Sequence, residues 1–132
     1  MKLPAHKDFP SVFAKLRAML KPFEPRLVVE ADSEAGYSLN TPYLEKFGKP
    51  LFFGAAQIKK NYVSYYLMPV YVCPELLKGI SPELRKHMQG KSCFNFSKFE
   101  PGLFEELAGL TRQGFDRFEQ EFFPKSLPFG KS

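Results

Sequence analysis

The spacing of hydrophobic residues changes several times along the chain, and each change predicts a structural element. Between residues 9 and 21 the apolar residues recur at helical spacing, with Lys15, Arg17 and Lys21 on the other face. Those apolar residues are Val12, Phe13, Leu16, Met19 and Leu20. Asp8 is placed to cap this helix, and Pro22 is placed to end it. We therefore expect a first helix over about residues 9–21.

Two hairpins follow in the sequence. Residues 26–31 have the composition of a strand, residues 36–40 of its partner, and a polar turn separates them. Residues 51–58 and 62–68 are the clearest strands, joined by a short turn at residues 59–61. Neither face of this second hairpin carries a charge. We expect it to lie in the middle of a sheet and to be covered on both faces.

The second half of the chain predicts mostly helix. A helical turn at residues 74–78 is followed by a helix that starts at Ser81 and runs to Gln89, with Gly90 in the helix-ending position. Residues 93–96 form a short strand, and Glu100-Pro101 opens a long helix with an apolar stripe. Strands and helices are segregated rather than strictly alternating. The expected fold class is α+β, a mainly antiparallel sheet with an N-terminal helix, short middle helices and a long C-terminal helix packed on it.

Length and composition place these elements in one domain. The chain has 132 residues, of which 44% are hydrophobic, and we expect a single domain over 1–132 with loose ends at about 1–7 and 124–132. It has no apolar run of the ~20 residues that a membrane span needs. The N-terminus lacks the apolar core of a signal peptide, so a cytoplasmic protein with Cys73 and Cys93 reduced is expected. A monomer and a dimer both remain open.

Catalytic motifs are poorly supported. Gly90-Lys91-Ser92 resembles the end of a phosphate-binding loop, but Arg85 stands where the motif needs its first glycine. His87 could activate Cys93, although a histidine beside Lys86 on a surface helix is more often solvated. The question of an enzyme therefore stays open, with a non-enzymatic protein favoured.

The sequence also gives little support for a metal-binding site or a nucleic-acid-binding site. Glu30, Asp32 and Glu34 are the only candidate carboxylate ligands, and a polar turn explains them more simply. No cofactor is expected, with iron as the alternative. Lysines mix with tyrosines over residues 59–66, as in some nucleic-acid-binding surfaces. Because no recognition motif accompanies them and a hairpin turn favours lysine anyway, nucleic acid is disfavoured as a partner.

Aromatic residues are the feature left to explain. Eight of them fall on the predicted strands or strand ends, and core packing accounts for most. They are Phe52, Phe53, Tyr62, Tyr65, Tyr66, Tyr71, Phe94 and Phe96. If helices cover one face of the sheet, tyrosines on the other face would line a concave pocket or a protein-binding surface.

Three segments resemble the YdhG-like domain, also called DUF1801. Residues 49–56 with 60–66 are similar to its central hairpin, residues 90–96 to the following strand, and residues 100–110 to its C-terminal helix. The family segment Gly-Met-Pro-aromatic is reduced here to Pro42 and Tyr43. The resemblance implies a small bacterial cytosolic α+β domain, mostly of unassigned function, with one branch that looks like a frataxin-type iron chaperone. The net charge of +5 argues against that iron role here.

From the absence of a catalytic motif and the aromatic residues on the strands, we expect non-enzymatic binding of a small molecule on an aromatic-lined sheet face. The alternative is a frataxin-like iron-binding chaperone or a protein-interaction module. The expected ligand-binding residues are Phe53, Tyr65, Tyr66, Lys91, Ser92 and Tyr43. The ligand itself, whether a small molecule or a protein partner, is not identified by the sequence.

Overall fold

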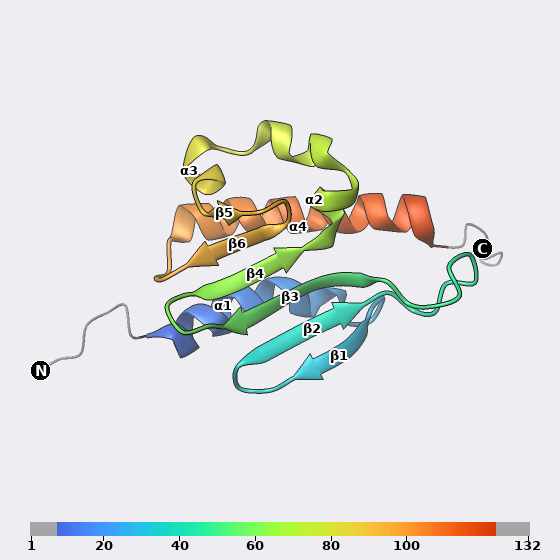
Figure 1. Cartoon of the computed structure of the whole chain (residues 1–132), viewed down its shortest axis with the longest axis horizontal. Helices are drawn as coiled ribbons and strands as arrows, with labels where there is room; N and C mark the ends of the chain where they lie inside the picture. Colours follow the sequence, from blue (N-terminus) through green and yellow to red (C-terminus); the bar gives the residue numbers. More distant parts are fainter. Residues whose placement is uncertain (1–7, 124–132) are drawn as a thin grey trace, which may run out of the picture.

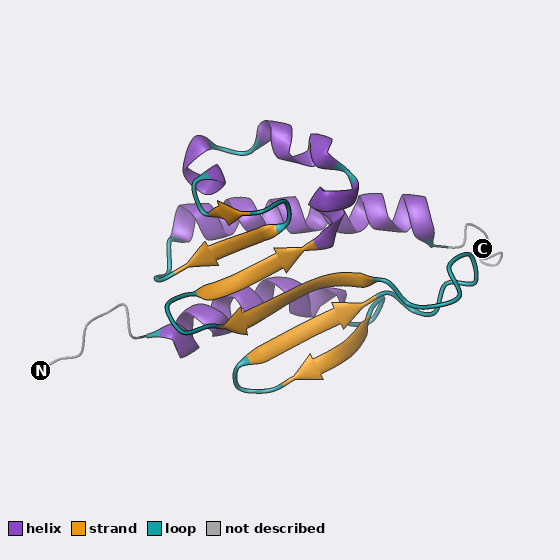
Figure 2. Ribbon diagram, viewed as in Figure 1, coloured by secondary structure: helices purple, strands orange, loops and turns teal. Residues whose placement is uncertain are grey.

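A computed structural model describes residues 8–123, so both expected loose ends lie outside the described residues. The chain folds as α+β, with a six-stranded antiparallel sheet and two long helices (Figures 1 and 2). The strands are β1 (Val28–Asp32), β2 (Gly36–Asn40), β3 (Phe52–Ile58), β4 (Val63–Leu67), β5 (Met88–Gln89) and β6 (Cys93–Phe96). The helices are α1 (Phe9–Leu20), η2 (Lys21–Phe23), α2 (Met68–Val72), η3 (Pro74–Gly79), α3 (Pro82–Arg85) and α4 (Pro101–Phe122).

The strand order is β1-β2-β3-β4-β6-β5, so the β3–β4 hairpin lies in the middle of the sheet as predicted. The expected cover on both faces is only partly present: Ala55 and Ser64, which face away from the helices, are buried. The two long helices, α1 and α4, lie on the same side of the sheet, and no helix of residues 8–123 covers the other side (Figure 1). The hairpin side chains on this side, which we call the open face, are uncharged: Ala55, Gln57, Ser64 and Tyr66.

The core lies between the sheet and the helices. Leu16 and Leu20 of α1 and Leu107 and Phe118 of α4 are fully buried against it. A register shift between β2 and β3 next to Phe53 turns two successive residues of β3 towards the helices. The Phe53 ring then lies 5.5 Å from the Phe118 ring, and a Cβ added to Gly54 would lie 3.2 Å from Leu20. This bulge makes Phe53 a core residue.

Two local predictions need correction. Asp8 stands before α1, but its side chain makes no capping hydrogen bond. The helix expected to reach Gln89 ends at Arg85, and Met88–Gln89 instead pair with β6 as an edge strand. Gly90 has a positive φ of 77°, and this conformation serves the tight β5–β6 turn, because α3 ends well before it at Arg85. Pairing with β6 outweighs helical propensity over these few residues.

Within residues 8–123, none of the helices combines the length and apolar character that crossing a lipid bilayer requires.

Candidate functional site

A cavity of about 600 Å³ lies between the α2–η3 segment and the β5–β6 hairpin. This volume is in the usual range for small-molecule sites. We call it the α2–β5 cavity. Its lining residues are Val70, Tyr71, Pro74, Leu77, Arg85, Met88, Gly90 and Lys91.

Backbone contacts hold its two walls in place. The amide N–H of Leu67, at the end of β4, donates to the carbonyl of Ser92 at 2.9 Å, which ties the β5–β6 turn to the start of α2. Pro69 of α2 packs against Gly114 of α4, where a Cβ would lie only 2.8 Å from the proline ring. Glu75 of η3 accepts a hydrogen bond from Arg117 of α4 at 2.6 Å. The cavity is therefore formed between anchored segments.

The walls are apolar, and the charges that line the cavity are basic. Arg85 Nη2 donates to the carbonyl of Leu77 at 2.6 Å, which orients the guanidinium and leaves most of its N–H groups free. Lys91 is exposed on the β5–β6 turn. The lining residues include no carboxylate. Tyr71 is 54% exposed and presents an accessible ring at the same cavity.

The structure does not bring the six expected ligand-binding residues together. Lys91 lines the α2–β5 cavity and Ser92 is its half-buried neighbour. Tyr66 lies on the open face of the sheet, whereas Phe53 and Tyr65 are fully buried on the helix side. Phe53 and Tyr65 therefore cannot line a pocket on the open face, because a bulge turns one and strand alternation turns the other towards the core.

Tyr43 is separate from the rest. It is 64% exposed and lines a different hollow, beside Phe122 and Phe123 at the end of α4.

The three candidate metal ligands do not form a metal site. Asp32 forms a bidentate pair with Arg17, with Nη2–Oδ2 at 2.9 Å. Glu30 Oε1 accepts a hydrogen bond from Asn40 Nδ2 at 3.2 Å, and Glu34 is exposed in the turn. Over residues 8–123, no three His, Cys, Asp or Glu side chains are close enough together to hold a metal ion.

The expectation of a solvated His87 is wrong. Its ring stacks on Phe96 at 4.5 Å, and its Nε2 lies 3.3 Å from Glu100 Oε2. Its Nδ1 lies 2.8 Å from the carbonyl of Asn95. Both ring nitrogens are thus occupied by groups other than Cys93, and burial raises the pKa of the Cys93 thiol. The arrangement does not provide a thiolate nucleophile.

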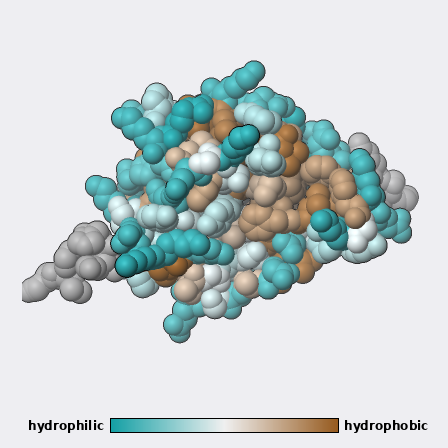
Figure 3. All heavy atoms as spheres, viewed as in Figure 1, coloured by the Kyte–Doolittle hydropathy of each residue, from teal (hydrophilic) through white to brown (hydrophobic). Residues whose placement is uncertain are grey.

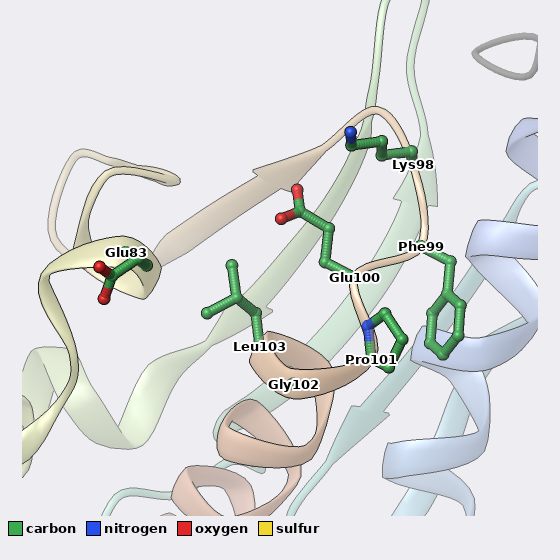
Figure 4. A pocket seen from close by; sticks show the side chains of 7 residues that line it. All are labelled: Glu83, Lys98, Phe99, Glu100, Pro101, Gly102 and Leu103. Atoms are coloured by element: carbon green, nitrogen blue, oxygen red, sulfur yellow. The ribbon is translucent and has the colours of Figure 1, made fainter.

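A second hollow, of about 490 Å³, lies where α4 begins (Figure 4). The carboxylates of Glu83 and Glu100 flank Leu103 there, and Phe99 and Pro101 lie beside α1 (Figure 4). This hollow is wide open, and its Glu100 carboxylate is already paired with His87. The α2–β5 cavity is the better candidate, because its basic groups have no acidic partner among the lining residues.

Of the residues that line the α2–β5 cavity, the sequence-based expectation includes Lys91 but not Arg85, Tyr71 or Met88. A helix running from Ser81 to Gln89, as the sequence predicts, gives no reason to place Arg85 near Lys91. Ending α3 at Arg85 and forming the β5–β6 turn is what brings the two basic residues to one cavity.

No family model, curated protein or solved structure matches the chain. The resemblance to the YdhG-like domain therefore stays an expectation.

Proposed function

We propose that this domain binds a small organic anion with an apolar, preferably aromatic, body in the α2–β5 cavity, without catalysis. The observation that carries the proposal is that Arg85 and Lys91 converge on a cavity whose other walls are apolar. A guanidinium and an ammonium at the rim would neutralise a carboxylate or phosphate group. Val70, Leu77 and Met88 would bury the apolar part, and the Tyr71 ring would stack on it.

The proposed ligand is a small molecule, as the sequence predicts, but the proposed binding site is at a different place in the fold. The expected site was the aromatic face of the sheet, whereas the proposed one lies at the edge, between β5 and α2. Lys91 is the one expected residue that takes part directly.

A matched pair of probes tests the proposal: indole-3-acetate and its neutral analogue indole-3-acetamide. The two molecules have the same aromatic body and differ in charge. We expect the carboxylate to raise the thermal unfolding midpoint and the amide to raise it much less, because only the carboxylate pairs with the basic rim. Equal shifts with both probes, or no shift with either, would contradict the proposal.

Substitutions of the two basic residues test whether the carboxylate probe binds in the α2–β5 cavity. Arg85→Gln and Lys91→Gln should each reduce the shift caused by the carboxylate. Lys86→Gln is the control, because Lys86 is exposed next to Arg85 but does not line the cavity. A loss of the shift in Lys86→Gln as large as in Arg85→Gln would mean that net charge, not the cavity, attracts the probe.

A further inference from the structure

The open face of the sheet is a second surface with a distinct chemistry. Residues paired across β3, β4 and β6 form two rows on it, Ala55-Tyr66-Cys93 and Gln57-Ser64-Asn95. None of these six side chains is charged; Ala55 and Ser64 are buried, and the other four are half-buried. Viewed from this side, the surface over the middle of the sheet mixes pale and tan residues with teal ones (Figure 3).

Tyrosine rings are accessible on this face. Tyr66 is half-buried, and the ammonium of Lys59 lies 5.9 Å from its ring centre. The Lys59 amide donates to the Tyr62 carbonyl at 2.8 Å, which continues the β3–β4 pairing by one pair. Strand alternation therefore places Tyr62 on the same face as Tyr66, roughly 13 Å away along the strand. Two tyrosine rings therefore lie on one face of the sheet, and the Lys59 ammonium lies next to one of them.

Amide groups lie beside the tyrosines. Ser64 donates to Asn95 Oδ1 at 2.6 Å, and Asn95 Nδ2 donates to Gln89 Oε1 at 2.7 Å. These contacts fix the amide orientations and leave further donors and acceptors on Gln57 and Gln89 for a ligand. Such neutral groups can hydrogen-bond to the edges of unpaired bases.

Lysines border this face at the hairpin end. Lys59 and Lys60 are exposed there, and Lys98 follows β6 at the same end because Phe96 pairs with Val63. The acidic residues of the sheet lie at the far edge, on or next to β1, where Asp32 is paired with Arg17. The charge near the tyrosines is therefore positive and suits a phosphate backbone.

We propose that the open face over β3, β4 and β6 binds single-stranded nucleic acid. Bases stack on Tyr66 and Tyr62, the amides of Gln57 and Gln89 contact base edges, and Lys59, Lys60 and Lys98 neutralise phosphates. This site is separate from the α2–β5 cavity and does not depend on the proposed anion binding. It also departs from the sequence-based expectation, because Lys59 of the turn lies on the same face of the sheet as Tyr62 and Tyr66, and no helix of the described residues covers that face.

Fluorescence anisotropy with a fluorescein-labelled twelve-nucleotide oligo(U) tests this proposal. We expect saturable binding at low salt that weakens linearly on a log–log plot as salt rises. Tyr66→Ala should weaken binding roughly tenfold, since a stacked base is lost, while Tyr66→Phe keeps the ring and the affinity. Lys59→Gln should weaken binding and lower the salt slope by about one.

Matched controls separate stacking from general charge attraction. Tyr43→Ala and Lys46→Gln remove an exposed tyrosine and a lysine far from this face and should leave the affinity and the salt slope near those of the parent protein. A duplex of the same length should bind much more weakly, because its bases are already stacked. Absence of saturable oligo(U) binding, equal binding of the duplex, or parent-like affinity of Tyr66→Ala would each overturn the proposal. Circular dichroism confirms that each variant is folded.

Discussion

The hydroxyl of Tyr65 lies 2.6 Å from the hydroxyl of Thr111, which joins the central strand β4 to the long helix α4. Thr111 Oγ1 also lies 2.9 Å from the carbonyl of Leu107 and donates to it, so Tyr65 is the donor to Thr111. Both side chains are fully buried. Burial raises the pKa of Tyr65, which keeps the hydroxyl protonated and able to donate.

Removing the hydroxyl of Tyr65 and removing the hydroxyl of Thr111 should lower the unfolding free energy by different amounts. Tyr65→Phe removes one buried hydrogen bond and should cost about 1 kcal/mol of unfolding free energy. Thr111→Val leaves the Tyr65 hydroxyl buried without a partner and should cost more, about 1–3 kcal/mol. The double variant should lose less than the sum of the two. Urea unfolding measures all four proteins, and strict additivity would show that the two hydroxyls do not interact.

Two glycines of α4 should respond oppositely to alanine. A Cβ on Gly114 would lie 2.8 Å from Pro69 Cβ, so Gly114→Ala should force α2 away and destabilise the protein by about 1–3 kcal/mol. At Gly109 the nearest atom is Arg112 Nη2 at 3.7 Å, an ordinary contact. Gly109→Ala should therefore gain helical propensity, about 0.5–1 kcal/mol. Thermal unfolding of both variants checks the sign, and a stabilised Gly114→Ala would mean that α2 does not lie against α4.

Stability should fall in acid because of Glu24. The hydrogen bond from Tyr37, at 2.6 Å, and a second from Lys21 hold the pKa of the Glu24 carboxyl below its usual value of 4.5. A carboxyl with a lowered folded-state pKa stabilises the protein above pH 4.5, and this contribution is lost as the pH falls through the folded-state value. Glu75 adds to the trend, since Arg117 lowers its pKa in the same way.

The variant Tyr37→Phe isolates the Glu24 contribution. It removes the main cause of the lowered pKa, so its unfolding midpoint should decrease less than that of the parent protein between about pH 6 and pH 3. Some acid sensitivity remains because Glu75 still pairs with Arg117. Parallel pH profiles for the two proteins would contradict the assignment to Glu24.

The Cys93 thiol should react slowly. Burial is the main cause that raises its pKa above the usual value of 9.0, so little thiolate is present at neutral pH. In a Cys73→Ser background, alkylation by iodoacetamide at pH 8 should be roughly tenfold or more slower for the folded protein than for the same protein in denaturant. Equal rates would show that Cys93 is accessible and normally ionised, and would reopen the question of a nucleophile.

The sequence by itself determined the elements that are long or strongly patterned. Helical spacing from Val12 to Leu20 predicts α1, and the stripe from Phe104 to Phe118 predicts α4, because each helix buries one face along its whole length. The polar turns predicted at residues 32–34 and 59–61 do separate the strands of both hairpins, at residues 33–35 and 59–62 of the structure. The α+β class follows from the order of these elements and is confirmed.

Only the tertiary structure decided which residues share a surface. Ending α3 at Arg85 depends on pairing between β5 and β6, and β6 is in turn held by long-range pairing with β4, which leaves Arg85 and Lys91 lining one cavity. A single-residue bulge turns Phe53 into the core, and alternation separates Tyr65 from Tyr66, although the two residues are adjacent in sequence. The sequence pattern shows which side chains are apolar. The strand register and the placement of the helices determine which side chains are exposed to solvent. Candidate sites therefore emerged from contacts across the sheet and its edge rather than from spacing along the chain.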